Sequence, residues 1–221
     1  MGRITDRLMA VRHRIDAAAE EFGRNPEAIE LIAVSKTFPP SAIEEAMHAG
    51  QKAFGENYVQ EALEKWPQIK AQFLDVKLHF IGKMQSNKVA DALDLFDSID
   101  SVDSEKLALE IQKQSLKKQK NPEIFIQVNI GQEPQKSGID PLLTKEFVDF
   151  AKNSCKLNVV GLMSIPPEGE APAPYFALLN KLAKESGLQK LSIGMSSDFE
   201  DAIALGATHI RVGEAIFGKR K

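Results

Sequence analysis

The sequence has few of the residue types that mark disulfide-rich, thiolate-metal or membrane proteins. Its 221 residues include one cysteine, one tryptophan and two tyrosines. The lone Cys155 allows no intrachain disulfide and no thiolate metal site, so a reducing compartment fits. No apolar run approaches the ~18 residues of a membrane span, and residues 1–19 alternate charged with apolar groups, unlike a secretion signal. We therefore expect a cytoplasmic protein that does not enter a membrane.

Charge of either sign is not concentrated anywhere along the chain. The 28 lysines and arginines nearly balance the 31 acidic residues, for a net charge of -3. Without a strongly basic block, we expect no nucleic-acid partner. The HExxH, Walker and GxGxxG patterns and any acidic metal cluster are also missing, so no metal ion is expected. His13 and His48 fall in expected helices and His209 begins an expected strand, which favours structural roles for all three.

What is present is a regular alternation of short apolar runs with amphipathic segments. Apolar residues from Ile4 to Ala18 recur at helical spacing, and Gly23 stands where a helix would end. Eight later runs favour strands: 30–35, 52–55, 76–82, 96–100, 123–130, 157–163, 190–195 and 208–213. Segments that fit helices between them include 41–48, 104–119, 145–153, 175–186 and 198–205.

This alternation with short connections favours parallel strands joined by right-handed crossovers. Eight units in about 200 residues fit a small (β/α)8 TIM-type barrel with an additional N-terminal helix better than an open sheet of five or six strands. No linker or change of composition divides the chain, so we predict a single domain over residues 1–221. The proline-rich stretch 165–174 is expected to be a mobile loop after the sixth strand.

In such barrels the functional face lies at the carboxyl ends of the strands. That rule selects eight candidate positions: Lys36, Asn57, His79, Asn129, Ser164, Ser196, Arg211 and Gly213.

The last two strand ends have features of a phosphate site. Ser197 and Glu200 have the spacing of a capping box, which predicts a helix N-terminus just beyond Ser196. Gly213 would let the backbone approach a ligand closely and a short helix begin. Together they predict a phosphate site in the loops after strands seven and eight, although each alone is equally typical of an ordinary cap or turn.

Lys36 ends the apolar run LIAVSK. A lysine at the rim of a barrel loses hydration, which favours the neutral amine that attacks carbonyl carbons. Opposite a phosphate site, it would suit a phosphorylated aldehyde. The position of Lys36 alone would fit an exposed surface lysine equally well. The sequence around His79 fits a hydrogen-bonded core histidine as well as it fits a histidine that contacts the ligand.

Eight segments along the chain resemble the motifs of one protein family, and they occur in the same order as in that family. They are AVSKTFP (33–39), FGENYVQE (54–61), HFIGKMQSNK (79–88), SIDSVDS (98–104), VNIGQEPQKSG (128–138), GLMSI (161–165), GMSSDFEDAI (194–203) and THIRVGEAIFG (208–218). The family they resemble is the pyridoxal phosphate homeostasis proteins.

The resemblance implies a barrel similar to the N-terminal domain of alanine racemase, with pyridoxal 5'-phosphate (PLP) as cofactor. It implies that Lys36 is the Schiff-base lysine, and that Ser196 and the backbone at Gly213 hold the phosphate. Arg211 would face the pyridine nitrogen. The pocket-lining residues implied are Asn57, His79 and Ser164, with Lys136 at the mouth. The loop between Ile165 and Phe176 departs from the family, because it is short and proline-rich and lacks an arginine before Phe176.

A protonated arginine beside the pyridine nitrogen would keep that nitrogen unprotonated and weaken the ring as an electron sink. Racemases that share such an arginine have a second base from an additional β domain, which nothing in this sequence resembles. Only Tyr58 and Tyr175 offer a phenol. We therefore predict a carrier or regulator of PLP in vitamin B6 homeostasis, without substrate turnover. The alternatives are a PLP-dependent amino-acid racemase or other PLP enzyme, and a Schiff-base aldolase acting on a sugar phosphate.

The expected partners follow from that role. They are PLP and other B6 vitamers, together with PLP-dependent client enzymes in transient contact. We expect the chain to be a monomer.

Overall fold

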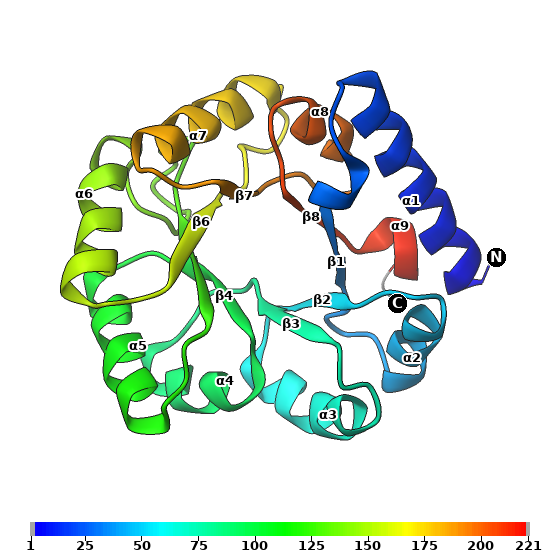
Figure 1. The fold of residues 1–221 in the computed structure, drawn as a ribbon, viewed down its shortest axis with the longest axis horizontal. Coiled ribbons are helices and arrows are strands. Elements are labelled where there is room, and N and C mark those ends of the chain that lie inside the picture. The colour runs from blue at the N-terminus through cyan, green and yellow to red at the C-terminus, as the bar shows by residue number, and fades with distance from the viewer. Residues whose placement is uncertain (1–2, 220–221) are drawn as a thin grey trace.

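The computed structural model describes residues 3–219. Its eight strands pair in parallel and in chain order to form a closed barrel (Figure 1). They are β1 Glu30–Val34, β2 Ala53–Glu56, β3 Lys77–Phe80, β4 Ser98–Val102, β5 Glu123–Gln127, β6 Val159–Met163, β7 Lys190–Ser192 and β8 His209–Val212. Because β8 pairs with β1, the first and last strands lie side by side. The predicted fold class is confirmed, and every strand boundary lies within three residues of its expected place.

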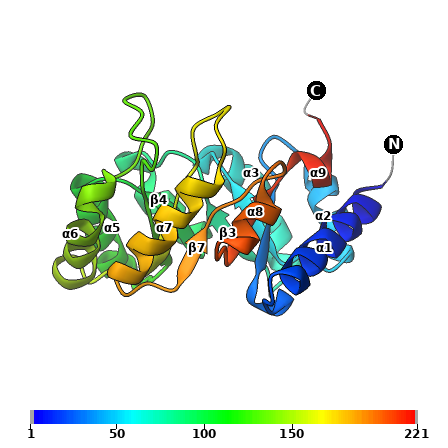
Figure 2. The same ribbon diagram turned by 90° about the horizontal axis from the view of Figure 1, so that it is seen from above.

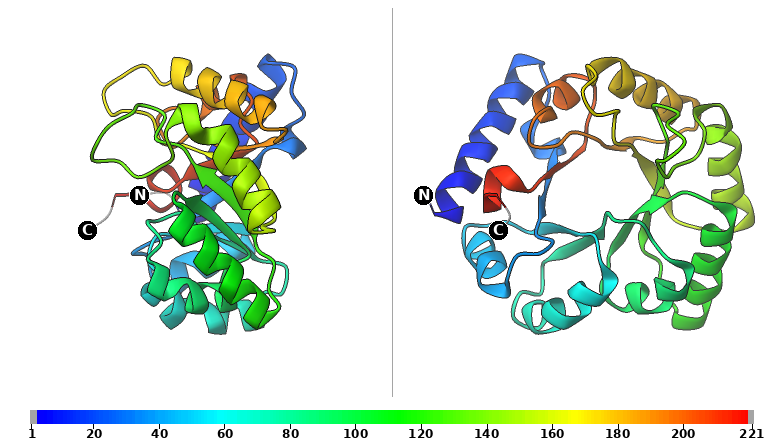
Figure 3. Two further views of the ribbon diagram at one scale, coloured as in Figure 1. Left: turned by 90° about the vertical axis from the view of Figure 1, so that its left-hand side faces the viewer. Right: turned by 180° about the vertical axis from the view of Figure 1, so that it is seen from behind.

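Helices form a ring outside the strands (Figures 1 and 3). They are α1 Ile4–Glu21, α2 Pro40–His48, α3 Val59–Gln72, α4 Val89–Leu95, α5 Glu105–Lys118, α6 Thr144–Asp149, α7 Ala173–Glu185, α8 Phe199–Ala204 and α9 Glu214–Phe217. A π-helical turn, Phe150–Ser154, continues α6. The sequence analysis had not singled out α3 or α4. In α3 the helix continues through Pro67, whose ring usually interrupts a helix.

Aromatic side chains fill the layer between the strands and the helices. Phe54 of β2 lies 5.3 Å from the Trp66 ring of α3, and Phe80 of β3 lies 5.2 Å from Phe96. The barrel strands, by contrast, also carry buried polar side chains. They include Glu56, His79, Ser98, Asp100, Ser101, Ser192, His209 and Arg211. The apolar layer outside the barrel therefore holds the fold, while polar groups are available for chemistry within it.

Helix α1 covers the seam between β8 and β1, beside α8 and the short α9 (Figure 1). The Arg7 side chain donates to the Ile216 carbonyl over 2.6 Å, and Arg14 forms an ion pair with Glu200. The additional N-terminal helix thus occupies the place beside the last strand that a longer final helix would take.

The loops after β5 and β6 project from one face of the barrel (Figure 2). This is the face formed by the carboxyl ends of the strands, where the sequence analysis placed the site. None of the helices within residues 3–219 combines the length and the apolar character needed to cross a bilayer.

Candidate functional site at the carboxyl ends of the strands

Barrel closure brings Lys36 and Gly213 to neighbouring strand ends. Ala33 of β1 pairs with Val212 of β8, and the chain leaves the sheet one or two residues later on each strand. A side chain at Gly213 would lie 3.3 Å from Val34, so glycine permits this close approach. Lys36 is half-buried in the turn after β1. Lys36 and Gly213 therefore follow two paired strands, although they lie far apart in the sequence.

Arg211 is the buried cation of this region, with 5% of its surface exposed. One terminal nitrogen, Nη1, donates to the Ser192 carbonyl over 2.6 Å and to its hydroxyl over 2.8 Å, and Nη2 donates to the Ser164 carbonyl over 2.9 Å. Burial lowers the pKa of Arg211 to about 10, against the opposing effect of the Asp100 and Asp198 charges. The guanidinium is therefore still protonated at neutral pH.

Ser164 and Asn57 present buried oxygens without a protein partner. Ser164 follows β6 and is fully buried, yet its hydroxyl makes no hydrogen bond to residues 3–219. The same is true of the Asn57 side-chain oxygen, which follows β2. Buried polar atoms nearly always have a partner, so two such oxygens at strand ends indicate a place for water or a polar ligand.

The turn at Asn57 also explains a residue that the sequence analysis overlooked. A Cβ at Gly82 would lie 2.1 Å from the Asn57 carbonyl oxygen, closer than any real contact. Position 82 therefore requires glycine for the β2–α3 turn to reach this place. Its only signal in the sequence was its position inside the HFIGKMQSNK segment.

Lys136 lies at the mouth, where the resemblance had placed it. It lines a cavity of about 250 Å³ together with Asn57 and Asn129. Its ammonium donates to the Pro166 carbonyl over 3.0 Å and forms an ion pair with Glu133. Lys136 thus ties the loop after β5 to the loop after β6. The Asn129 side chain bonds both the Glu133 carbonyl and the Glu133 amide, so it braces the loop that carries Lys136.

The predicted capping box after β7 is wrong. The helix begins at Phe199, one residue later than a cap at Ser197 would require, and Asp198 precedes it. The Asp198 carboxylate accepts from the Met195 amide over 2.6 Å and so organises the turn in place of Ser197. Glu200 is directed to Arg14 of α1 instead of back to the cap.

The other residues predicted to form a phosphate site lie in the turns after β7 and β8. Ser196 is half-buried in the turn after β7. The short helix expected after Gly213 is α9, which begins at Glu214. The first amides of a helix have no acceptor within the helix, so those of α9 are available beside β8.

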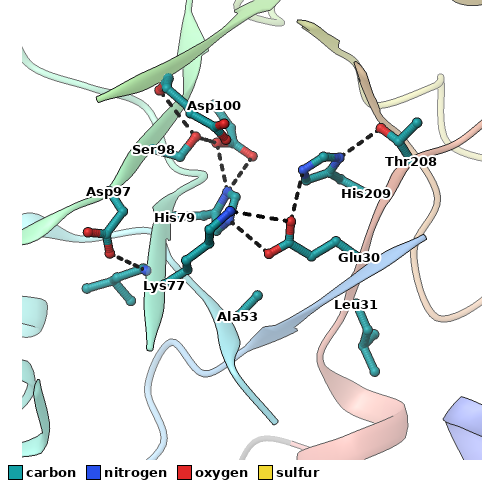
Figure 4. A network of polar contacts seen from close by, with 12 residues as sticks. Glu30, Leu31, Ala53, Lys77, His79, Asp97, Ser98, Asp100, Thr208 and His209 are labelled. Carbon is teal, nitrogen blue, oxygen red and sulfur yellow. Dashed lines mark hydrogen bonds and ion pairs between the residues drawn. The ribbon is translucent and has the colours of Figure 1, made fainter. Parts of the chain in front are cut away.

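His79 belongs to the barrel interior and not to the mouth. Its Nδ1 lies 3.2 Å from Asp100, and its Nε2 faces Glu30 at 3.9 Å. Glu30 also lies 3.2 Å from His209, and both begin their strands, which places this network toward the amino ends (Figure 4). This placement agrees with the core-histidine alternative. The structure does not bring His79 together with the other candidate residues.

The interior network is strongly coupled electrostatically. Burial alone would lower the pKa of His79, but the carboxylates of Asp100 and Glu30 outweigh it and raise that pKa. Burial raises the pKa of Glu30, yet His209, His79 and Lys77 hold it at about 2. The pKa of Asp100 is likewise lowered, because His79 and Ser98 outweigh the effect of burial. His79 therefore lies between two carboxylates that favour its charged form.

A larger hollow lies at the opposite end of the barrel from the candidate site. It has a volume of about 820 Å³ and is lined by residues that include Arg12, Glu30 and Gln51. Its Gln51 amide is already bonded to the Leu31 and Ala53 carbonyls, and Arg12 donates to Gln51. Of these groups only the Arg12 Nε is a buried atom that lacks a partner among residues 3–219, so this hollow has less unsatisfied polar surface than the mouth has with the oxygens of Asn57 and Ser164.

Outside the candidate site, the described residues offer neither a group of metal ligands nor a reactive thiol. Within residues 3–219, no group of three or more histidine, cysteine and acidic side chains is arranged to hold a metal ion. Cys155 is buried beside the π-helical turn, and burial followed by the Glu105 charge raises the pKa of its thiol. A thiol held in its neutral form is a poor nucleophile.

The family model for the alanine racemase N-terminal domain matches residues 7–221. A pyridoxal phosphate homeostasis protein of Aquifex aeolicus (strain VF5) is 41% identical, over 98% of each chain. The protein of the same name from Escherichia coli (strain K12) is 40% identical, over 100% of this chain and 98% of its own. The chain belongs to the pyridoxal phosphate homeostasis protein family. The resemblance drawn from its motifs is thereby confirmed.

A solved structure supports the same assignment. PipY of Synechococcus elongatus PCC7942, with PLP bound, superposes with a TM-score of 0.84 at 36% identity. The alignment covers 97% of this chain and 100% of PipY. Fold and family therefore agree over nearly the full length of both proteins.

Proposed function

We propose that this chain binds PLP as a Schiff base on Lys36 and serves PLP homeostasis without turning over a substrate. The observation that carries the proposal is a pair of unsatisfied oxygens at the strand ends, the face of the barrel that also carries the half-buried Lys36. The buried side-chain oxygens of Asn57 and Ser164 have no hydrogen-bond partner among residues 3–219. The names of the curated relatives and the PLP-bound PipY structure support the same ligand.

The residues at the mouth fit the parts of this cofactor. The Lys36 amine would attack the aldehyde carbon; a C=N bond forms and the aldehyde oxygen leaves as water, with no oxidant or reductant needed. The Ser196 hydroxyl and the first amides of α9, after Gly213, would hold the phosphate. Arg211 would face the pyridine nitrogen, with Asn57 and Ser164 lining the pocket and Lys136 at its mouth. We assign His79 no direct contact with the cofactor, and propose that it acts only through its contact with Asp100 inside the barrel.

The chemistry of the site favours holding the cofactor over using it. Bound PLP supplies an electron-withdrawing ring, but a protonated Arg211 beside the ring nitrogen would keep that nitrogen from gaining a proton. A racemase also needs a second acid or base. Tyr58 is 58% exposed, and the Tyr175 hydroxyl donates to Glu170, which raises the pKa of that phenol. Neither phenol is prepared to exchange protons over the barrel mouth.

Borohydride trapping tests the proposal directly. After incubation with PLP, the protein should show a visible chromophore that borohydride removes, and mass analysis of peptides should find the reduced adduct on Lys36. The Lys36→Ala variant should lose that peptide adduct and keep its circular dichroism spectrum. Lys52→Ala is a matched control, because Lys52 is exposed and paired with Asp75 at the other end of β2. A wild-type protein without an adduct on Lys36 would overturn the proposal.

A PLP-dependent racemase is the second candidate, because the matching family model is that of a racemase domain. A chiral assay with free amino acids separates the two. Racemisation well above the rate of free PLP would favour the enzyme, and a rate equal to that of free PLP would favour the carrier. An aldolase would instead form a borohydride-trapped adduct with a sugar phosphate in the absence of PLP.

We also propose that other B6 vitamers bind at this site and that PLP passes from a monomeric, cytoplasmic carrier to PLP-dependent enzymes in transient contact. A shared pyridine ring and phosphate are the physical reason for expecting related vitamers. Profiling B6 vitamers and amino-acid pools in a deletion strain tests this role, which undisturbed pools would contradict.

A further inference from the structure

Behind the turn that carries Lys36 lies a buried charged cluster that binding of the cofactor does not use. Lys65 of α3 has a side chain only 7% exposed, and its ammonium lies 2.8 Å from Glu56 and 2.7 Å from Glu61. The same ammonium donates to the carbonyl of Ser35 over 3.0 Å and reaches that of Phe38 at 3.4 Å. Lys65 thus contacts the backbone on both sides of the turn.

The turn has a second attachment through Glu61. The Thr37 amide donates to the Glu61 carboxylate over 2.6 Å, on the same oxygen that binds Lys65. Thr37 has a φ of 67°, in the left-handed region that residues with a Cβ rarely adopt. Such a conformation costs on the order of 1 kcal/mol and persists only where the surroundings impose it. Here Glu61 supplies a bond to the amide of the strained residue itself.

The first side of the turn is fixed in the same way. The Ser35 amide donates to the Gly55 carbonyl over 3.0 Å, and the Ser35 hydroxyl donates to Glu56 over 2.7 Å. Glu56 is fully buried, and the Trp66 indole nitrogen also donates to it, over 3.0 Å. The residues before and after Lys36 are therefore each bonded to α3, to β2 or to both.

We infer that Glu61 and Lys65 are positioning residues that hold the turn so that the Lys36 amine is presented to the cofactor. The inference rests on the proposed function. Neither residue would touch the cofactor, since both bond the turn from α3, on the outer side of the strands. The rate at which a nucleophile reacts depends steeply on where the protein holds it, because fixing its position in advance removes much of the entropic barrier. A lysine on a loosened turn would still bear its amine but would meet the aldehyde less often.

The chain offers a matched pair of substitutions on one helix. Glu61→Ala removes the acceptor of the Thr37 amide and one partner of Lys65, while Glu64→Ala removes an exposed carboxylate of α3 that has no described contact with the turn. Glu61→Gln keeps an oxygen for Thr37 and loses the charge. Lys65→Met removes the centre of the cluster, at the risk of unfolding because it leaves a buried carboxylate.

Stopped-flow absorbance after mixing with PLP gives the rate of Schiff-base formation, and borohydride trapping with peptide mass analysis gives its location. Thermal unfolding without PLP reports stability separately. We expect Glu61→Ala to form the Lys36 adduct about tenfold more slowly than wild type and to shift part of the adduct to other lysines. Glu64→Ala should match wild type, and Glu61→Gln should fall between the two.

Equal rates and equal adduct locations in Glu61→Ala and Glu64→Ala would overturn the inference, whatever their melting temperatures. A lower melting temperature with an unchanged rate would mean a structural role alone and overturns it as well. If Lys65→Met does not fold, the two Glu61 variants decide. If wild type forms no adduct on Lys36, the proposed function fails together with this inference, and that outcome is recognised from the wild-type sample alone.

Discussion

The two ends of the barrel interior are both polar, but they bury different kinds of polar group. At the amino ends of the strands, charged groups face one another: Glu30 is placed between His79 and His209, although the Nε2 atoms of these histidines make no hydrogen bond within residues 3–219, and Asp100 accepts from Ser98 over 2.6 Å. At the carboxyl ends, the oxygens of Asn57 and Ser164 lack protein partners.

The difference separates groups that stabilise the fold from groups that bind a ligand. Buried charges that are paired with one another interact mostly within the protein. Removing one partner leaves the other charge buried and uncompensated, which lowers the free energy of unfolding. Polar atoms buried without partners lower stability slightly and gain their partner when a ligand arrives. Substitutions at the two ends should therefore change different measured quantities.

The largest effect should follow from breaking the amino-end network at Asp100. Asp100→Asn removes the charge that faces His79, and loss of one partner of a buried ion pair costs about 3 kcal/mol. Urea denaturation should show this loss in the free energy of unfolding. Asp94→Asn is the control, because Asp94 forms an exposed pair with Lys118 that contributes under about 1 kcal/mol. Equal losses in the two variants would refute the contrast.

A smaller, pH-dependent effect should follow from Glu30→Gln. The pKa of Glu30 is about 2 in the folded protein, below the ordinary value of about 4.3 for an unfolded chain. A carboxyl whose pKa falls on folding stabilises the folded state above the unfolded value and loses that contribution as the pH drops toward 2. Because Glu30 is partly exposed, we expect about 1–2 kcal/mol at pH 7.

The difference in unfolding free energy between wild type and Glu30→Gln should therefore shrink between pH 4.5 and 2.5. Urea titrations at several pH values measure it. Glu27→Gln, at the same rim of the barrel, should change stability by less than about 0.5 kcal/mol. A difference that stays constant with pH would argue against the ion pair with His209.

The smallest effect on stability should come from the carboxyl end. Ser164→Ala removes a buried hydroxyl without a protein partner, so the unfolding free energy should change by less than about 0.5 kcal/mol. Loss of a hydrogen bond to the ligand should weaken PLP binding by about 1 kcal/mol, roughly fivefold in Kd. Fluorescence titration with PLP measures this. Ser186→Ala is the control, since Ser186 also has a partnerless hydroxyl but ends α7 at the other end of the barrel. A large loss of stability in Ser164→Ala would contradict the comparison.

Much of the barrel could be predicted from local pattern. The run ELIAVS and its seven counterparts are apolar and bounded by turn residues, so their strand character and parallel order were evident. Helix α3 was harder to recognise, because the proline at position 67 disfavours a helix. In the folded protein the buried side chains of Trp66 and Ile69 hold α3 against the core. Tertiary packing outweighed local preference there.

The sequence predicted which positions would lie at the candidate site, but not the contacts that their side chains make. The rule that strand ends carry function selected Lys36, Asn57, Ser164 and Arg211, which follow or end their strands. It also selected His79, because a pattern of alternation does not tell which end of the barrel interior a side chain reaches. The capping box failed because Ser197 and Asp198 are both good helix caps, and only the three-dimensional turn distinguishes them. The Glu61–Lys65 pair lies on a helix and had no such rule to reveal it.

The arrangement of α1 has a consequence for how the chain is made. Its buried face packs on α8 and α9, and Arg24 just beyond it donates to the carbonyls of Ile203 and Ala207. During synthesis α8 and α9 leave the ribosome long after α1 does. The apolar stripe of Leu8, Val11 and Ile15 therefore lacks its final packing partners until α8 and α9 have been translated.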